Sequence, residues 1–360
     1  MKFKGNVAVV TGGGDGMGRE LTKALVAYGC SVAICDVNVA NMNTTKKEAM
    51  AFASNDVKVT TFQCDVSKEA QLLAFAKHVE ENHALNNRGL LLFNNAGIAG
   101  GGSIVADKRE DWERTFNVCW YGVYYSVRAF MPLLLNATSG YVVNTSSVNG
   151  FWASVGFMRP HTSYAASKFA VKGFTEALIN DFRLNAPHLQ AAVVMPGHIG
   201  TGIAENSGQQ RRKVDFSQIR ANTKLISQRV AELKAKNDPQ YKLLSENPQM
   251  LMGYENGGKM MDNISDAQLQ KQIAARGASF RNNATTTAKE AAEIILNGVR
   301  NNEWRILVGP DAVALDESVR AAPLTAYDAN FMMKGFADFA KERQAAQTQK
   351  PKKVAVKSKM

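Results

Sequence analysis

The first two hundred residues alternate short apolar runs with longer segments whose apolar positions recur at helical spacing. The apolar runs are continuous and rich in β-branched residues, which is typical of strands covered by helices on both faces. The predicted strands are 7–11, 31–36, 57–64, 89–94, 141–146 and 190–195. The predicted helices are 19–28, closed by Gly29, then 68–81, capped by Ser67, then 111–135 and 165–184. This alternation predicts an α/β fold with a doubly wound parallel sheet.

The pattern changes after Pro196-Gly197. Residues 203–284 are polar and helical in spacing, with predicted breaks at Asp238-Pro239, Asn247-Pro248 and 253–258. A capping box at 287–290 then opens a helix to about residue 300, and a last strand follows at 305–308. We expect one domain over 1–344 that includes 203–284 as a long helical insertion, because the apolar content of that segment looks too thin for a core of its own.

The composition is that of a soluble globular protein, with 45% hydrophobic and 21% charged residues and no run long enough to cross a bilayer. The N-terminus lacks a signal-peptide pattern, so we expect a cytoplasmic protein. Of the net charge of +11, residues 341–360 supply seven Lys/Arg against one Glu, which leaves +5 for the rest. We therefore predict a basic disordered tail at 345–360 and no nucleic-acid partner, with contact to an anionic partner as the alternative for the tail.

The four cysteines show no metal-ligand spacing, so we predict reduced core cysteines and no metal site.

A glycine-rich segment joins the first strand directly to the first helix. Glycines permit a tight turn and close approach of main-chain N–H groups to a pyrophosphate, and the helix N-terminus favours its negative charge. The candidate cofactor-binding residues here are Thr11, Gly12, Gly14, Asp15, Gly16, Met17 and Gly18. Asp36 ends the second strand, where a carboxylate accepts hydrogen bonds from ribose hydroxyls and repels the extra phosphate of NADP, so NAD is favoured. A solvated carboxylate at the strand end is the alternative for Asp36. By the same topology, Asp65 and Val66 are expected beside the adenine.

Tyr164 and Lys168 lie one helical turn apart on the same face of a predicted helix. A nearby ammonium lowers the pKa of a tyrosine, which makes the phenol usable as a general acid or base. Ser147 follows the fifth strand, at the sheet edge where ligands bind in open α/β sheets, although Ser146 is an alternative for the same role.

Taken together, these motifs resemble the classical short-chain dehydrogenase/reductase family, which has a Rossmann-type fold. They are Thr11-Gly-x-x-x-Gly16-x-Gly18, Asn94-Asn95-Ala96-Gly97, Ser147, Tyr164-x-x-x-Lys168 and Pro196-Gly197. The likeness covers roughly residues 5–202 and more loosely 285–310.

The resemblance implies that Tyr164 moves the substrate proton, that Lys168 lowers the tyrosine pKa and binds the nicotinamide ribose, and that Ser147 holds the substrate oxygen. It implies that Asn117 holds a water in a proton relay, with bracing of the helix as the alternative. The remaining implied cofactor residues are Asn94, Ala96, Gly97, Pro196, Gly197, Ile199 and Thr201, of which the last two would contact the carboxamide.

Two features depart from the family pattern. Ser147 and Tyr164 are seventeen residues apart, and the extra residues form an aromatic-rich loop at 151–162 that we expect to shape the substrate pocket or to pack under a lid. The insertion at 203–284 is the second departure, and we hypothesise that it closes over the substrate. His161 and His198 flank the site in sequence, but a lone histidine is more often structural, and we leave both out of the catalytic set.

The sequence therefore predicts an NAD-dependent oxidoreductase that interconverts a secondary alcohol and a ketone, acting on an apolar and fairly bulky small molecule. The alternative is a catalytically silent NAD-binding sensor or scaffold, and a sugar epimerase or dehydratase is a weaker one. The family implies a homodimer or homotetramer through the helices at 111–135 and 165–184.

Overall fold

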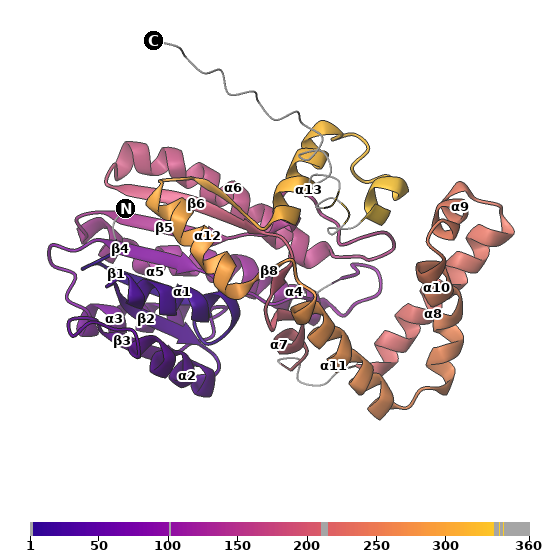
Figure 1. Cartoon of the computed structure of the whole chain (residues 1–360), viewed down its shortest axis with the longest axis horizontal. Helices are drawn as coiled ribbons and strands as arrows, with labels where there is room; N and C mark the ends of the chain where they lie inside the picture. The colour runs from indigo at the N-terminus through magenta and orange to yellow at the C-terminus, as the bar shows by residue number, and fades with distance from the viewer. Residues whose placement is uncertain (1–2, 101, 210–214, 335–337, 339–340, 342–360) are drawn as a thin grey trace, which may run out of the picture.

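The core of the protein is a parallel β-sheet. The computed structural model describes residues 3–100, 102–209, 215–334, 338 and 341. Within them the main sheet has seven strands in the order β3-β2-β1-β4-β5-β6-β9, and every neighbouring pair is parallel (Figure 1). The strands are β1 (Val7–Thr11), β2 (Ser31–Asp36), β3 (Val59–Gln63), β4 (Leu90–Asn94), β5 (Gly140–Thr145), β6 (Leu189–Pro196) and β9 (Arg305–Val308). The order reverses between β1 and β4, and this confirms the doubly wound Rossmann-type fold.

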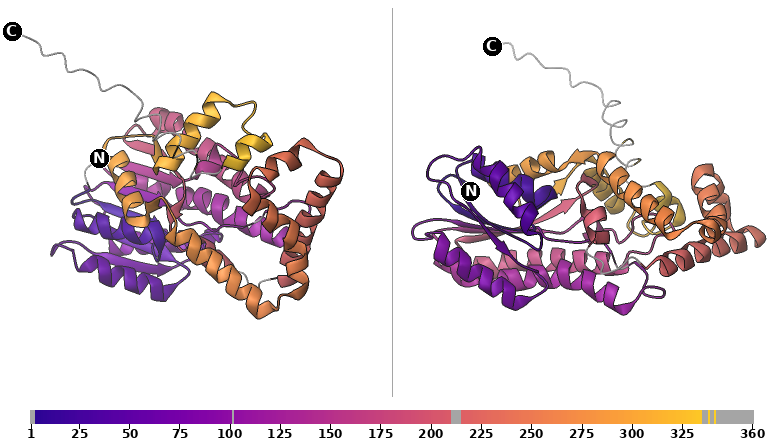
Figure 2. Two further views of the ribbon diagram at one scale, coloured as in Figure 1. Left: turned by 45° about the vertical axis from the view of Figure 1, so that its right-hand side comes forward. Right: turned by 90° about the horizontal axis from the view of Figure 1, so that it is seen from below.

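Helices cover both faces of this sheet, as the continuous apolar strands predict (Figure 2). One face packs against α1 (Gly16–Ala27), α2 (Val39–Met50) and α12 (Ala288–Arg300). The other packs against α3 (Glu69–Asn82), α5 (Gly122–Asn136) and α6 (Thr162–Asn185). Alternate residues of β1 belong to the two cores, Ala8 and Val10 to the first, Val7 and Val9 to the second.

The sequence pattern misplaced several helix boundaries. The predicted helix at 111–135 is interrupted: α4 (Arg109–Phe116) passes into a π-helical turn, η1 (Asn117–Tyr121), and then into α5. Ser67 does not cap α3, because the N-cap residue is Lys68 and the Ser67 hydroxyl donates to Asp65. Helix α2 was not predicted, since its periodicity is weak. The capping box at Thr287 and Glu290 is present as predicted.

The predicted insertion is helical and forms an arm that extends away from the sheet (Figure 1). Its helices are α7 (Ile203–Gln209), α8 (Phe216–Ala235), α9 (Pro239–Ser245), α10 (Pro248–Asn263) and α11 (Asp266–Asn282). Asp238 and Asn247 cap α9 and α10, each followed by proline at the first helical position. The predicted break at 253–258 is wrong, because those residues continue α10.

The arm has a small apolar core that it shares with two other segments. Val230, Leu233 and Leu244 from the arm pack with Phe157, and partly buried methionines at 332 and 333 join them. Trp152 is buried beside α13 (Pro310–Ala321), and its indole N–H donates to the carbonyl of Ala326. The loop at 151–162 is thus held between the arm and the C-terminal segment.

No helix in the described part of the chain is long and apolar enough to cross a membrane. The predicted basic tail at 345–360 lies outside the described residues.

Candidate active site

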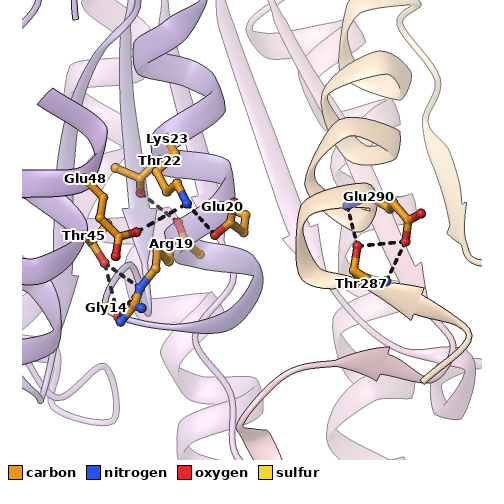
Figure 3. A network of polar contacts seen from close by, with 10 residues as sticks. Gly14, Arg19, Glu20, Thr22, Lys23, Thr45, Glu48, Thr287 and Glu290 are labelled. Carbon is orange, nitrogen blue, oxygen red and sulfur yellow. Dashed lines mark hydrogen bonds and ion pairs between the residues drawn. The ribbon is translucent and has the colours of Figure 1, made fainter. Parts of the chain in front are cut away.

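The glycine loop between β1 and α1 is built by close backbone contacts. Gly12 and Gly16 have φ angles of +66° and +52°, which favour glycine. A Cβ on Gly18 would lie 2.1 Å from the carbonyl oxygen of Gly12, so only glycine fits there. Arg19 braces the loop from outside, since its guanidinium donates to the carbonyl of Gly14 at 2.8 Å and to the Thr45 hydroxyl at 3.2 Å (Figure 3).

Thr11 holds the loop to the end of β4. Its buried hydroxyl accepts hydrogen bonds from the main-chain N–H groups of Asn95 and Ala96, at 3.0 and 3.1 Å. Asn94 is buried under the cleft, where its amide donates to Asn144 at 2.8 Å. Asn95 lines the cleft in its place, so the structure puts the second asparagine of the pair, and not the predicted first one, at the cofactor side.

A cavity of about 540 Å³ opens along the carboxyl ends of β1 and β2. Of the predicted cofactor residues it is lined by Gly12, Asp15, Gly16, Met17, Asp36, Ala96, Gly97 and Thr201. Sequence reasoning missed other residues of its wall. They come from the segment after β2 and the start of α2, from the end of β3, from the loop after β4, and from α7 with the residue before it: Val37, Asn38, Val39, Asn41, Gln63, Ile98, Gly202, Ile203 and Asn206. Asp65 and Val66 line a smaller adjoining hollow of about 80 Å³ together with Gly12 and Asp36.

Asp36 lies at the rim of this cavity. Its carboxylate accepts from the main-chain N–H groups of Gly14 at 3.1 Å and Asn38 at 3.0 Å. Burial raises the pKa of Asp36, and the N–H groups of Asn38 and Gly14 oppose that shift by stabilising the charged form. Asp15 is held from the arm, because the amide of Asn206 donates to its carboxylate at 2.7 Å.

A second cavity, of about 220 Å³, adjoins the first and shares Met17, Asn95, Gly97, Thr201 and Ile203 with it. Ser147, Tyr164 and Lys168 line it, and so do Pro196, Gly197 and Ile199. We call it the reaction chamber. Ser147 lies after β5 and its hydroxyl is hydrogen-bonded to Tyr164. The Ser146 hydroxyl instead donates to the carbonyl of Lys168 at 2.7 Å, so the geometry favours Ser147 as the serine that meets a ligand.

The two titratable groups of the chamber are strongly affected by burial. The Lys168 ammonium is buried, donates to the carbonyl of Thr145 at 2.8 Å and lies 5.4 Å from the centre of the Tyr164 ring. Burial lowers the pKa of Lys168. Burial raises the pKa of Tyr164, and the hydrogen bond from Ser147 only partly opposes this. The sequence pattern predicts that Lys168 lowers the pKa of Tyr164, but the net effect of the protein groups is to raise it.

Asn117 does not reach the chamber, and this corrects its predicted place in a proton relay. It begins the π-helical turn η1 and is exposed. The extra residue in that turn brings Cys119 inward, where it is fully buried and its thiol donates to the carbonyl of Ile98 at 3.3 Å. Cys119 is close enough to affect the pKa values of both Tyr164 and Lys168. No sequence pattern indicated this exchange of Asn117 for Cys119, because it depends on a π-helical turn.

The roof of the chamber comes from distant segments. The loop at 151–162 supplies Val155 and His161, and the last turn of α11 supplies Phe280. The His198 ring lies 4.2 Å from the Phe280 ring and its Nε2 is hydrogen-bonded to the carbonyl of Phe280 at 2.6 Å. Arg281 pairs with Glu205 at 2.9 Å and so ties α11 to α7. Both alternatives for the loop apply in part, since Val155 and His161 line the chamber and Phe157 packs against the arm. Phe280 could not be identified from the sequence.

A cleft at the carboxyl ends of the parallel strands that adjoins a buried Ser–Tyr–Lys group is the arrangement that an oxidoreductase with a nicotinamide cofactor needs. The comparisons with known proteins make the assignment specific. The family model described as short chain dehydrogenase matches residues 6–212. The chain therefore belongs to the short-chain dehydrogenase/reductase family, whose members depend on NAD or NADP.

Among its relatives, a putative oxidoreductase, SadH, of Mycobacterium tuberculosis is 34% identical over 205 residues, which are 57% of this chain and 71% of that protein. The 3-oxoacyl-acyl-carrier-protein reductase FabG of Thermotoga maritima is 29% identical over 219 residues, 61% of this chain and 84% of that protein.

Solved structures show the same fold. A short-chain dehydrogenase/reductase from Burkholderia phymatum in complex with NAD superposes with a TM-score of 0.63 at 24% identity, covering 89% of this chain and 96% of that one. Levodione reductase superposes with a TM-score of 0.57 at 22% identity, covering 87% and 99%.

Proposed function

We propose that this protein is an NAD-dependent oxidoreductase that interconverts a secondary alcohol and a ketone. The observation that carries the proposal is the reaction chamber, in which Ser147, Tyr164 and Lys168 share a wall with the cofactor cleft. A substrate oxygen beside Tyr164 would lie next to the place where a nicotinamide enters. The fold alone would not support this function, because Rossmann-type sheets serve many others.

In alcohol oxidation Tyr164 takes the hydroxyl proton at its phenolate oxygen while Ser147 donates a hydrogen bond to the substrate oxygen. The bound nicotinamide supplies the hydride acceptor. Lys168 is oriented by its hydrogen bond to Thr145, and its ammonium would bind the nicotinamide ribose and favour negative charge on Tyr164. In the reverse direction Tyr164 donates its proton to the carbonyl oxygen.

We propose NAD as the preferred cofactor. The described lining of the cofactor cavity contains two carboxylates, Asp15 and Asp36, and no Lys or Arg. A ribose phosphate at Asp36 would meet a negative charge without a cationic partner, whereas a free hydroxyl would find an acceptor. NAD should therefore bind at least tenfold more tightly than NADP, and Asp36→Ser should narrow the difference. An unchanged ratio of NAD to NADP affinity in Asp36→Ser would count against the preference for NAD.

The chamber favours a compact substrate that is uncharged near the reacting carbon. Lys168 is the charged side chain in its described lining, and the apolar residues of the wall include Val148, Val155 and Phe280. Its volume of about 220 Å³ is below the ~300–1,000 Å³ usual for drug-sized ligands, so a compact alcohol fits better than the fairly bulky one expected from the sequence.

The test is NADH formation by the purified full chain with a panel of secondary alcohols. Tyr164→Phe should lower turnover by about 10²–10⁴-fold and leave NAD binding intact, because only the proton-transferring oxygen is removed. Tyr121→Phe is the matched control, since Tyr121 is 37% exposed on η1. Turnover that survives in Tyr164→Phe would overturn the mechanism. NAD binding without turnover on any alcohol would favour the silent sensor.

We propose that the arm formed by α7–α11 acts as the substrate lid. Its residues Ile203, Asn206 and Phe280 already line the two cavities, so closure needs only small movements. NAD together with a turned-over alcohol should slow tryptic cleavage within 215–282 relative to the free protein. Equal cleavage rates would refute the lid.

We also propose a homodimer or homotetramer through α5 and α6, where Leu135 and Leu184 are exposed. Light scattering on the purified chain tests this, and a monomeric mass at micromolar concentration would contradict it.

A further inference from the structure

His161 is a chamber residue that the proposed reaction does not use. It precedes α6 and its ring lies 4.8 Å from the ring of Tyr164, tilted by 35°. It lines the reaction chamber and also an outer groove that contains Met158, Arg159 and Phe169. The imidazole therefore stands at the side of the chamber, beside the position that a reacting oxygen takes at Tyr164.

The His161 side chain has no hydrogen bond within the described residues, whereas Asn149 and His198 in the same wall are hydrogen-bonded to main-chain carbonyls. The Asn149 amide donates to the carbonyls of Trp152 and Ser154, at 3.0 and 2.7 Å. His198 is hydrogen-bonded to Phe280. The His161 nitrogens are therefore available to pair with a ligand that enters the chamber.

The protonation state of His161 decides what it offers. Burial lowers its pKa to about 4, so at neutral pH the ring is uncharged and presents one N–H donor and one nitrogen acceptor. A neutral ring pairs with a hydroxyl or a carbonyl oxygen. It offers no cation for a carboxylate or a phosphate.

We propose that His161 binds a second oxygen of the substrate, on the carbon next to the reacting one. The substrate class is then a vicinal diol, and transfer of one hydride to NAD and one proton to Tyr164 gives the corresponding hydroxyketone. Ser147 and Tyr164 hold the reacting oxygen, and His161 holds its neighbour, since the His161 and Tyr164 rings lie side by side. This inference rests on the proposed function and makes its substrate specific.

The experiment compares matched pairs that differ only in the second oxygen: butane-2,3-diol with butan-2-ol, cyclohexane-1,2-diol with cyclohexanol, and 1-phenylpropane-1,2-diol with 1-phenylpropan-1-ol. The wild-type chain should turn over the diol of at least one pair with a kcat/KM at least tenfold above its mono-alcohol. His161→Leu should remove that preference, chiefly by raising KM for the diol. His161→Gln keeps a donor and an acceptor and should restore part of it. NAD affinity and thermal unfolding serve as folding controls for both variants.

The outcomes separate the two proposals. A diol preference that persists in His161→Leu, or no preference in the wild type, overturns the role of His161 and leaves the alcohol dehydrogenase standing. An equal fall in kcat for both members of a pair, with a changed pH profile, would show that His161 acts on Tyr164 instead and would also overturn the proposal. No turnover of any pair contradicts the proposed function itself, and with it this inference.

Discussion

Replacing Thr11 by valine tests whether the glycine loop and the end of β4 are held together as the structure indicates. The Thr11 hydroxyl accepts from the N–H groups of Asn95 and Ala96, at 3.0 and 3.1 Å, and the side chain is buried. Valine has nearly the same shape and no acceptor, so the Ala96 N–H would lose its partner, whereas the Asn95 N–H keeps its hydrogen bond to the carbonyl of Phe93 at 3.1 Å. An unpaired buried N–H costs about 1–3 kcal/mol. Because Ala96 is only half-buried and water reaches part of the site, we expect the lower end, about 1 kcal/mol.

Urea unfolding of the wild type and of Thr11→Val measures this loss, which should appear as a lower midpoint with an unchanged slope. Thr11→Ser keeps the hydroxyl and should recover most of the stability. Thr22→Val is the matched control: the Thr22 hydroxyl donates to the carbonyl of Gly18 at 2.8 Å, and its loss orphans no N–H group. NAD affinity should fall in Thr11→Val, because Asn95 and Ala96 line the cofactor cavity. A free energy of unfolding within about 0.5 kcal/mol of the wild type, with equal NAD affinity, would refute the reasoning.

Three further changes are informative. Gly18→Ala should abolish NAD binding in calorimetry, because its Cβ would lie 2.1 Å from a main-chain oxygen. Gly253→Ala is the control, since its Cβ meets nothing within 4 Å and NAD binding should not change. Tight NAD binding by Gly18→Ala would show that the loop can rearrange. Burial and then Lys58 lower the pKa of His83 to about 4, below that of a histidine in the unfolded chain. The contribution of neutral His83 to the free energy of unfolding is therefore full above about pH 6.5 and is lost as the pH falls towards 4. His83→Gln should remove about 2 kcal/mol of this pH dependence, and equal pH dependence of stability in the variant and the wild type would contradict the prediction. Asn117→Ala should leave kcat within about twofold of the wild type, because the residue is exposed. Cys119→Leu should lower kcat at least about tenfold by crowding the buried chamber wall. A larger fall in kcat for Asn117→Ala than for Cys119→Leu would restore Asn117 to the site.

The sequence by itself determined the sheet and the chemistry that lies close to it. Apolar runs locate β1, β2 and β9 to the residue, and parallel strands bring their carboxyl ends to one edge. Gly18, Ser147, Tyr164 and Lys168 could be placed because each belongs to a short local pattern: a turn that follows a strand, a strand end, or one helical turn.

Only the tertiary structure decided which neighbours complete the site. A single extra residue in the π-helical turn η1 exposes Asn117 and buries Cys119, and no spacing rule for an α-helix shows that shift. The choice of Asn95 over Asn94 depends on which face of β4 turns towards the cleft. Phe280 reaches the chamber because the arm folds back through its contacts with His198. Local propensity fixes an element and its face, but the contacts between distant segments depend on how the buried surfaces of the whole chain fit together.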